Sequence, residues 1–140
     1  MNLNDAVAQI QRSCSKMQRL YGRTVFDEFA IIGIERSQLK SLYYEGPREA
    51  VFMASFADDS LALRKELRDG GRQEAGAFNF TREAEGSGID AYICLGQDLY
   101  LFCNHTEKSM KDISEDPAWL DTQGCFLNLA QAFAVDPLEI

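Results

Sequence analysis

The sequence predicts a mixed α/β fold in which a five-stranded antiparallel sheet carries helices on both faces. Three observations lead to this prediction. Residues 24–35 place apolar side chains on both faces of a strand, short turn sequences separate the strand-like segments, and further segments carry apolar residues at helical spacing. The 140 residues are enough for one hydrophobic core, so we expect a single domain over residues 1–140.

Residues 24–35 form the expected central strand. Side chains alternate along a strand, so its apolar residues separate into two sets. One set contains Val25, Phe29 and Ile31, and the other contains Phe26, Ala30, Ile32 and Ile34. A strand that is apolar on both faces is typical of a sheet covered on both sides, and we therefore place it in the interior.

Four more strands are expected. Residues 36–38 are predicted to form a short turn, after which residues 39–45 return as a more polar edge strand. Residues 75–83 alternate phenylalanine with polar side chains, which indicates a strand with one buried face. Residues 89–95 and 99–105 flank a Gly-Gln-Asp turn and predict a hairpin of two interior strands.

Helices are expected over residues 3–21, 47–69 and 108–113, and a final amphipathic helix begins at residue 117. Short polar residues, proline and glycine mark where these helices begin and end. The expected boundary residues are Asn2 or Asn4, Gly22, Pro47, Gly70, Thr106, Asp116 and Pro117.

The helix over residues 47–69 carries two apolar stripes when it is projected at roughly 100° per residue. The first stripe contains Phe52, Phe56, Leu63 and Leu67. The second, mostly of small side chains, contains Ala50, Met53, Ala54, Ala57 and Leu61. A surface helix needs only one apolar face, so the second is expected to lie against another helix or a second copy of the protein. Alternatively, a break near residues 58–60 would give two short helices without a continuous second stripe.

The order of elements predicts the topology of the sheet. Strands joined by hairpins are antiparallel, and placing the most apolar strands together puts the first strand beside the fifth. The expected order is therefore 2-1-5-4-3.

In this topology the chain resembles the profilin-like folds, and most closely the roadblock family of dynein-light-chain-like proteins. The resemblance covers about residues 3–113 and rests on the element order and on the hairpin GIDAYICLGQDLYLF. It implies a non-enzymatic homodimer that serves as a scaffold or regulator for a small GTPase or another complex. The dimer would form through the helix between strands two and three and through strand three, which adds Phe78 and Phe80 to the candidate interface with Ala50, Met53, Ala54, Ala57 and Leu61.

Composition excludes several classes of partner. A net charge of −8 repels a phosphate backbone or an anionic membrane surface, so we expect neither nucleic acid nor membrane as a partner. No apolar run is long enough to cross a bilayer. The first residues lack the pattern of a secretion signal, which favours a cytoplasmic protein. The four cysteines are scattered through apolar patterns and are expected to be reduced core thiols.

The search for chemistry predicts no catalytic, cofactor or metal site. Cys103 and His105 would share a strand face, but no third group to orient a thiol-imidazole pair is evident. The cysteines lack the spacing of a zinc site, and the glycines at 86 and 88 fall in a turn between strands. Asp27 and Glu28 are adjacent and point to opposite faces, so they cannot act together, and Glu28 requires a partner such as Arg23, Arg36 or solvent.

Several functions therefore remain open. The first is the homodimeric interaction module. The second is an effector-binding chaperone similar to those of type III secretion, which would place a strand at residues 47–69. The third is a PAS-like small-molecule sensor with a closed cavity lined by aromatic residues. The fourth is an enzyme that uses Cys103 and His105.

Overall fold

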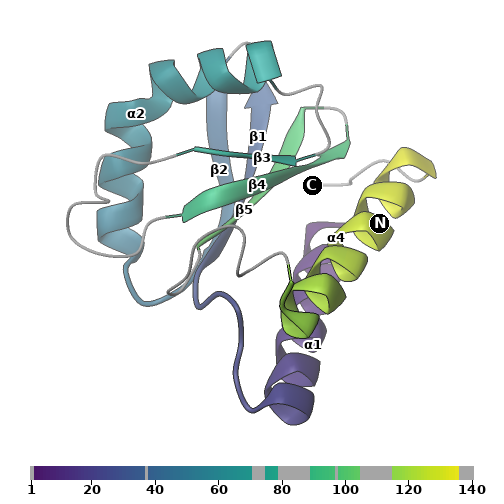
Figure 1. Cartoon of the computed structure of the whole chain (residues 1–140). Helices are drawn as coiled ribbons and strands as arrows, with labels where there is room; N and C mark the ends of the chain where they lie inside the picture. The colour runs from purple at the N-terminus through teal and green to yellow at the C-terminus, as the bar shows by residue number, and fades with distance from the viewer. Residues whose placement is uncertain are drawn as a thin grey trace. The chain divides into compact units, whose positions relative to one another are not determined.

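The computed structural model describes residues 2–36, 38–70, 75–78, 89–96, 98–104 and 115–135. Within these residues the chain is mixed α/β, as predicted, with three helices and five strands (Figure 1). In chain order the elements are α1 Leu3–Tyr21, β1 Phe29–Glu35, β2 Gln38–Glu45, α2 Glu49–Gly70, β3 Ala75–Ala77, β4 Ile89–Gly96, β5 Leu99–Asn104 and α4 Pro117–Val135.

Contacts divide the chain into two compact units. The first unit comprises Met1–Val25, Leu95–Gln97 and Lys108–Ile140, and it contains α1 and α4. The second comprises Phe26–Cys94 and Asp98–Glu107, and it contains α2 and most of the sheet. The single domain expected from the chain length stays a prediction, as does the placement of helices on both faces of the sheet.

The sheet is antiparallel, as predicted, and its strands lie in the order β2-β1-β5-β4-β3. Strand β1 pairs with β2 through a hairpin and with β5 along its other edge, so the expected contact between the first and fifth strands is present. Phe29 faces Glu45 on β2 and Cys103 on β5. The register of β1 on β2 shifts between Ile31 and Ile32, which marks a bulge in this pairing.

The central strand is shorter than predicted, because β1 begins at Phe29 and not at residue 24. At the two residues just before β1, the side chain of Asn104 at the end of β5 takes the place of a neighbouring strand. Its Oδ1 accepts hydrogen bonds from the backbone N–H groups of Asp27, at 3.1 Å, and Glu28, at 3.0 Å. These two N–H groups therefore bond to a side chain and not to a neighbouring strand. The pairing of β1 with β5 begins at the next residue, Phe29.

A hydrophobic core joins α2 to one face of the sheet. Ring contacts run through it, with Phe52 of α2 stacked on Tyr44 of β2 at 5.0 Å between centroids and Tyr92 of β4 5.3 Å from Phe102 of β5. The buried members of this core are Ala30, Ile32, Phe52, Phe56, Leu63, Leu67, Tyr92, Tyr100 and Phe102. Phe29 and Ile31, which alternate with these residues along β1, are buried as well, so the prediction of a central strand buried on both faces is confirmed.

Helix α2 is continuous from Glu49 to Gly70, so the alternative of a break near residues 58–60 is wrong. The helix begins two residues later than predicted, and Pro47 precedes it. The N–H of Arg48 donates to the Tyr44 hydroxyl at 3.1 Å, and the Arg48 carbonyl then accepts the hydrogen bond of Phe52 at 2.9 Å. Ser60 is accommodated because its hydroxyl donates to the carbonyl of Ala57 within the helix.

The expected boundaries of α1 and the expected start of α4 are confirmed. Asn2 caps α1 in a capping box with Asp5, and Gly22 ends the helix in the left-handed conformation at φ 69°. Pro117 is the first residue of α4, and Asp116 caps it by accepting from the N–H of Ala118 at 3.0 Å.

Some expected features lie outside the described residues. They are the helix over residues 108–113, its cap Thr106, the turn at residues 86–88, and the part of the third strand beyond Phe78. Of the helices that the structure describes, none combines the length and apolar character needed to cross a membrane.

Replacing Phe52 with alanine tests the core between α2 and the sheet. Phe52 is fully buried and contacts the rings of Tyr44 and Phe56, so we expect Phe52→Ala to lower the free energy of unfolding by about 3–5 kcal/mol. Urea unfolding measures this change. Asp58→Ala, an exposed position on the same helix, is the control and should change the value by less than about 0.5 kcal/mol. Equal effects of the two variants would contradict the assignment.

Candidate functional site

The candidate interface residues of α2 lie on its solvent-exposed side. Ala50, Met53, Ala54, Ala57 and Leu61 are all exposed, and we call these five residues the α2 stripe. The exposed fractions of its two large side chains are 41% for Met53 and 77% for Leu61. The large residues of the neighbouring stripe, Phe52, Phe56, Leu63 and Leu67, are buried against the sheet. The helix therefore presents an apolar strip to solvent in addition to the face that it buries.

The other two candidates do not extend this strip within the described residues. Phe78 is half-buried and packs against the core between α2 and the sheet, so its side chain belongs to that core. Its inclusion in the interface was implied by the resemblance to the roadblock family, which places strand three at the dimer surface. The alternation of residues 75–83 predicts one buried face but does not show which residues of the strand lie on it. Phe80 lies outside the described residues.

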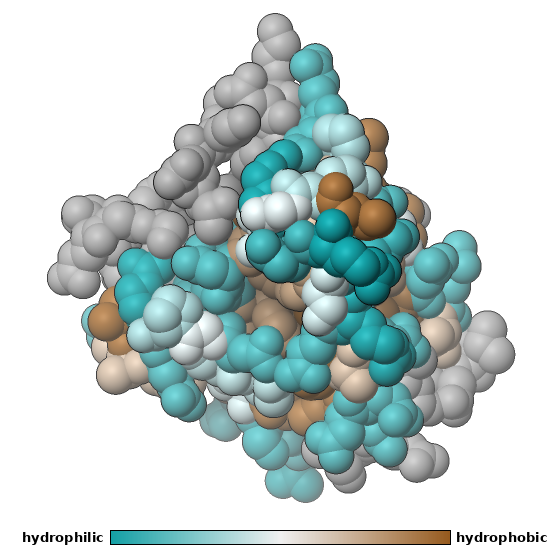
Figure 2. Space-filling view, turned by 90° about the horizontal axis from the view of Figure 1, so that it is seen from below, coloured by the Kyte–Doolittle hydropathy of each residue, from teal (hydrophilic) through white to brown (hydrophobic). Residues whose placement is uncertain are grey.

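Exposed apolar area is limited on the face of the molecule drawn in Figure 2. Hydrophilic residues cover most of the described surface there, and hydrophobic residues occur in small groups among them. Among the described residues, the exposed large hydrophobic side chains are Leu20, Tyr21, Met53, Leu61, Leu120 and Leu127. Two of these six belong to the α2 stripe, where three exposed alanines connect them into one strip.

A buried polar cluster lies where β1 begins. The Glu28 side chain is fully buried, and its Oε2 accepts a hydrogen bond of 2.5 Å from the Tyr44 hydroxyl. Its Oε1 lies 3.9 Å from the guanidinium of Arg48. The expectation that Glu28 needs a partner is confirmed, but the partners that were expected are wrong. Arg23 pairs with Asp116, while the partners of Glu28 are the Tyr44 hydroxyl and the Arg48 guanidinium.

The cluster leaves no room for a larger residue at position 46. A Cβ atom on Gly46 would lie 2.8 Å from the Tyr44 hydroxyl oxygen and 2.9 Å from Cγ of Glu28, which is closer than real Cβ contacts. On the other side of Glu28, the amide of Asn104 donates to the carboxylate of Asp27. The cluster thus joins β1, β2, β5 and the start of α2, and all its charged groups are occupied in holding these elements together.

The sequence did not predict that Tyr44, Arg48 and Asn104 contact Glu28. Tyr44 was expected in an edge strand, and Asn104 is not distinctive by itself. The signal that was available is the isolated glutamate in an apolar strand, since a buried carboxylate requires donors from elsewhere in the chain.

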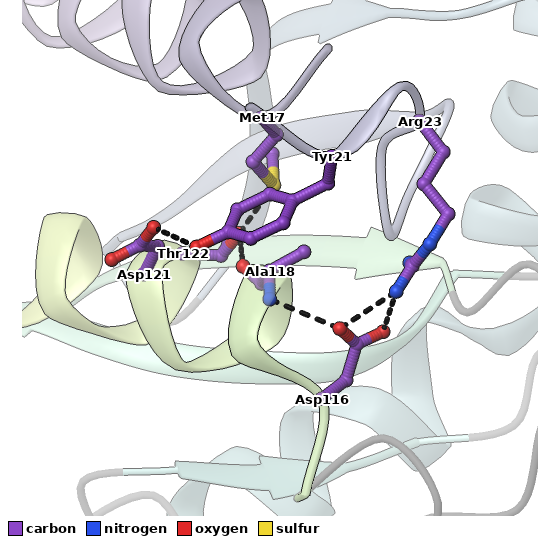
Figure 3. A network of polar contacts seen from close by, with 7 residues as sticks. All are labelled: Met17, Tyr21, Arg23, Asp116, Ala118, Asp121 and Thr122. Atoms are coloured by element: carbon purple, nitrogen blue, oxygen red, sulfur yellow. Dashed lines mark hydrogen bonds and ion pairs between the residues drawn. The ribbon is translucent and has the colours of Figure 1, made fainter. Parts of the chain in front are cut away.

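A second polar network joins α1 to α4 within the first unit (Figure 3). The guanidinium of Arg23 donates to both carboxylate oxygens of Asp116 at 2.7 Å, and the Tyr21 hydroxyl donates to Asp121 at 2.7 Å. Thr122 is buried and donates to the carbonyl of Ala118. These contacts connect the end of α1 to the start of α4. Further along α4, the Cys125 thiol contacts the carbonyl of Gln9 in the first half of α1, so the two helices run antiparallel.

The residues considered as catalytic groups or metal ligands do not form a site within the described part of the chain. Cys103 is buried on β5, and His105 lies outside the described residues, so their pairing stays untested. None of the four cysteines forms a disulfide. Within the described part of the chain, no three His, Cys, Asp or Glu side chains gather as ligands for a metal ion.

Comparisons with models of known families, with curated proteins and with solved structures give no match to this chain. The resemblance to the roadblock family is therefore an expectation from topology and enters below only as part of a proposal.

Removing the hydroxyl of Tyr44 tests the role of the buried cluster. Tyr44→Phe removes the hydrogen bond that the Tyr44 hydroxyl donates to the buried Glu28 carboxylate, so we expect the free energy of unfolding to fall by about 1–3 kcal/mol. Tyr43→Phe is the matched control on the same strand, because its hydroxyl donates to the partly exposed Glu45. Chemical denaturation of both variants gives the comparison. A larger loss from Tyr43→Phe would overturn the assignment.

The contact between Tyr21 and Asp121 is testable by alkaline titration. The hydrogen bond to Asp121 is the main cause that raises the pKa of Tyr21 above its ordinary value, followed by burial and the negative charge of Asp121. The folded state therefore holds this proton more tightly, and the stabilisation is present at neutral pH and lost as the pH rises through the raised pKa. We expect Asp121→Asn to lower the pKa of Tyr21, measured by NMR of the labelled ring.

Tyr43 provides an internal control in the same spectra. Burial and Glu45 raise its pKa, so Asp121→Asn should leave that pKa unchanged. A Tyr21 titration that does not respond to Asp121→Asn would contradict the network drawn in Figure 3.

Proposed function

We propose that this chain is a non-enzymatic, homodimeric protein-interaction module that self-associates through the α2 stripe. The observation that carries the proposal is the exposure of Ala50, Met53, Ala54, Ala57 and Leu61 along one side of a helix whose other side is buried in the core. An apolar strip that the described chain does not cover is typical of a surface that binds another protein.

The spacing of the stripe favours a second copy as the partner. Its members recur three and four residues apart, so they form a straight ridge along the helix. Alanine occupies three of the five positions, which permits two helix backbones to approach closely. Two copies related by a twofold axis would each bury the same surface against the other, with Met53 and Leu61 packing beside the alanines.

The course of α2 favours this function over the secretion chaperone. That alternative places a strand where residues 49–70 form a continuous helix. The rings expected to line a closed cavity in a PAS-like sensor instead contact one another, as Tyr92 does with Tyr100 and Phe102. In the proposed module, the dimer is of roadblock-like architecture, with helices on both faces of the sheet, and acts in the cytoplasm as a scaffold or regulator for a small GTPase or another protein.

A charge placed in the stripe tests the dimer. We expect the native chain to be a dimer at micromolar concentration by light scattering. Met53→Glu would bury a carboxylate in the interface and raise the dissociation constant at least about tenfold, or about 1.4 kcal/mol. Because Met53 is exposed within the protomer, the variant should retain its fold by circular dichroism.

The matched control is Leu127→Glu, which introduces the same charge at an exposed apolar residue of α4. It should leave the mass measured by light scattering unchanged. A native chain that stays monomeric at these concentrations, or a dimer that dissociates with Leu127→Glu and not with Met53→Glu, would refute self-association through the α2 stripe.

A further inference from the structure

A basic pocket opens beside the last turns of α2, within the second unit. It encloses about 720 Å³ between the ends of two hairpins and the C-terminal half of the helix. Its cationic lining residues are Arg36 from the turn after β1 and Arg64, Lys65 and Arg68 from α2. In Figure 1 the end of β1 and the last turns of α2 both lie at the top of the view.

The charge of this pocket is opposite to that of the protein. The chain carries a net charge of −8, yet the lining contains four cations and a single carboxylate, that of Asp98. In the part of the chain that the structure describes, Arg36, Arg64 and Lys65 form no ion pair. Like charges placed together repel one another, so an anion bound among Arg36, Arg64 and Lys65 would reduce the repulsion between these three side chains.

The base of the pocket is apolar and buried. Leu67 and Tyr100 line it and are almost fully buried, with 2% and 5% of their surfaces exposed. The two hairpins are held together here by a hydrogen bond of 2.8 Å from the Ile34 N–H to the Asp98 carbonyl. The pocket therefore combines a preformed apolar base with a cationic rim.

We propose that this pocket binds a small organic diphosphate, with the phosphates among the arginines and lysine and a planar organic group on Leu67 and Tyr100. Guanidinium groups bind phosphate oxygens through paired hydrogen bonds, and a lining with a net charge of +3 matches a multiply charged group better than a single carboxylate. The volume lies within the range of small-molecule sites, and the planar group can rest on the apolar base.

Of the residues that line the pocket, Leu61 alone also belongs to the α2 stripe. Its exposed side chain lies at the end of that stripe. Arg64 and Lys65 lie beyond the stripe along the helix. Variants at these two positions therefore report on the pocket, and light scattering of the same samples records whether self-association has changed.

Calorimetric titration with three probes tests the proposal. ADP carries both a diphosphate and a planar base, pyrophosphate carries the charge alone, and adenosine carries the planar group alone. We expect ADP to bind more tightly than either fragment and to lose affinity as the salt concentration rises. Arg64→Glu combined with Lys65→Glu should weaken ADP binding at least about tenfold, since two favourable charges become repulsive.

Arg12→Glu, which reverses the charge of an exposed residue on α1, is the control and should leave ADP binding unchanged. Circular dichroism of the double variant verifies its fold. Absence of ADP binding at millimolar concentration, or equal binding by the native chain and the double variant, would overturn the proposal. Binding of a hexaglutamate peptide with no binding of ADP would also overturn it and would indicate an acidic protein segment as the occupant.

Discussion

The arrangement of β1, β2 and α2 in the second unit depends on the fully buried carboxylate of Glu28. An ionised carboxylate away from water is costly unless donors surround it, and here the donors come from β2 and from the residue that precedes α2. The Tyr44 hydroxyl donates to Glu28 and accepts from the N–H of Arg48, so one side chain connects the central strand to the start of the helix. Gly46 is required because no side chain fits between Tyr44 and Glu28.

The position of α2 determines which surfaces are available for binding. Tyr44 also stacks on Phe52, and this contact orients the helix with Phe52, Phe56, Leu63 and Leu67 toward the sheet. The rotation of the helix about its axis then leaves the α2 stripe facing solvent. The same rotation directs Arg64, Lys65 and Arg68 toward the pocket formed with the two hairpin ends.

The two proposals therefore use successive portions of one helix. Its first three turns present small apolar residues suited to another helix, and its last two turns present cations beside an apolar base. The network of Arg23, Asp116, Tyr21 and Asp121 has a different role, since it joins two helices of the first unit and occupies its charged groups in doing so.

The sequence by itself determined the elements whose signals are local. Capping residues set the ends of α1 and the start of α4. Alternating apolar residues identified the buried strands, and apolar residues at helical spacing identified both stripes of α2, because each of these patterns depends on neighbours in the chain. Only the tertiary structure decided that β1 begins at Phe29, that Glu28 bonds to Tyr44 and Arg48, and that four cations meet at one pocket. The reason is physical, because these contacts join residues that are distant in sequence and that only folding brings together. Asn104 accepts hydrogen bonds from Asp27 and Glu28, and Arg36 lines a pocket with residues of α2.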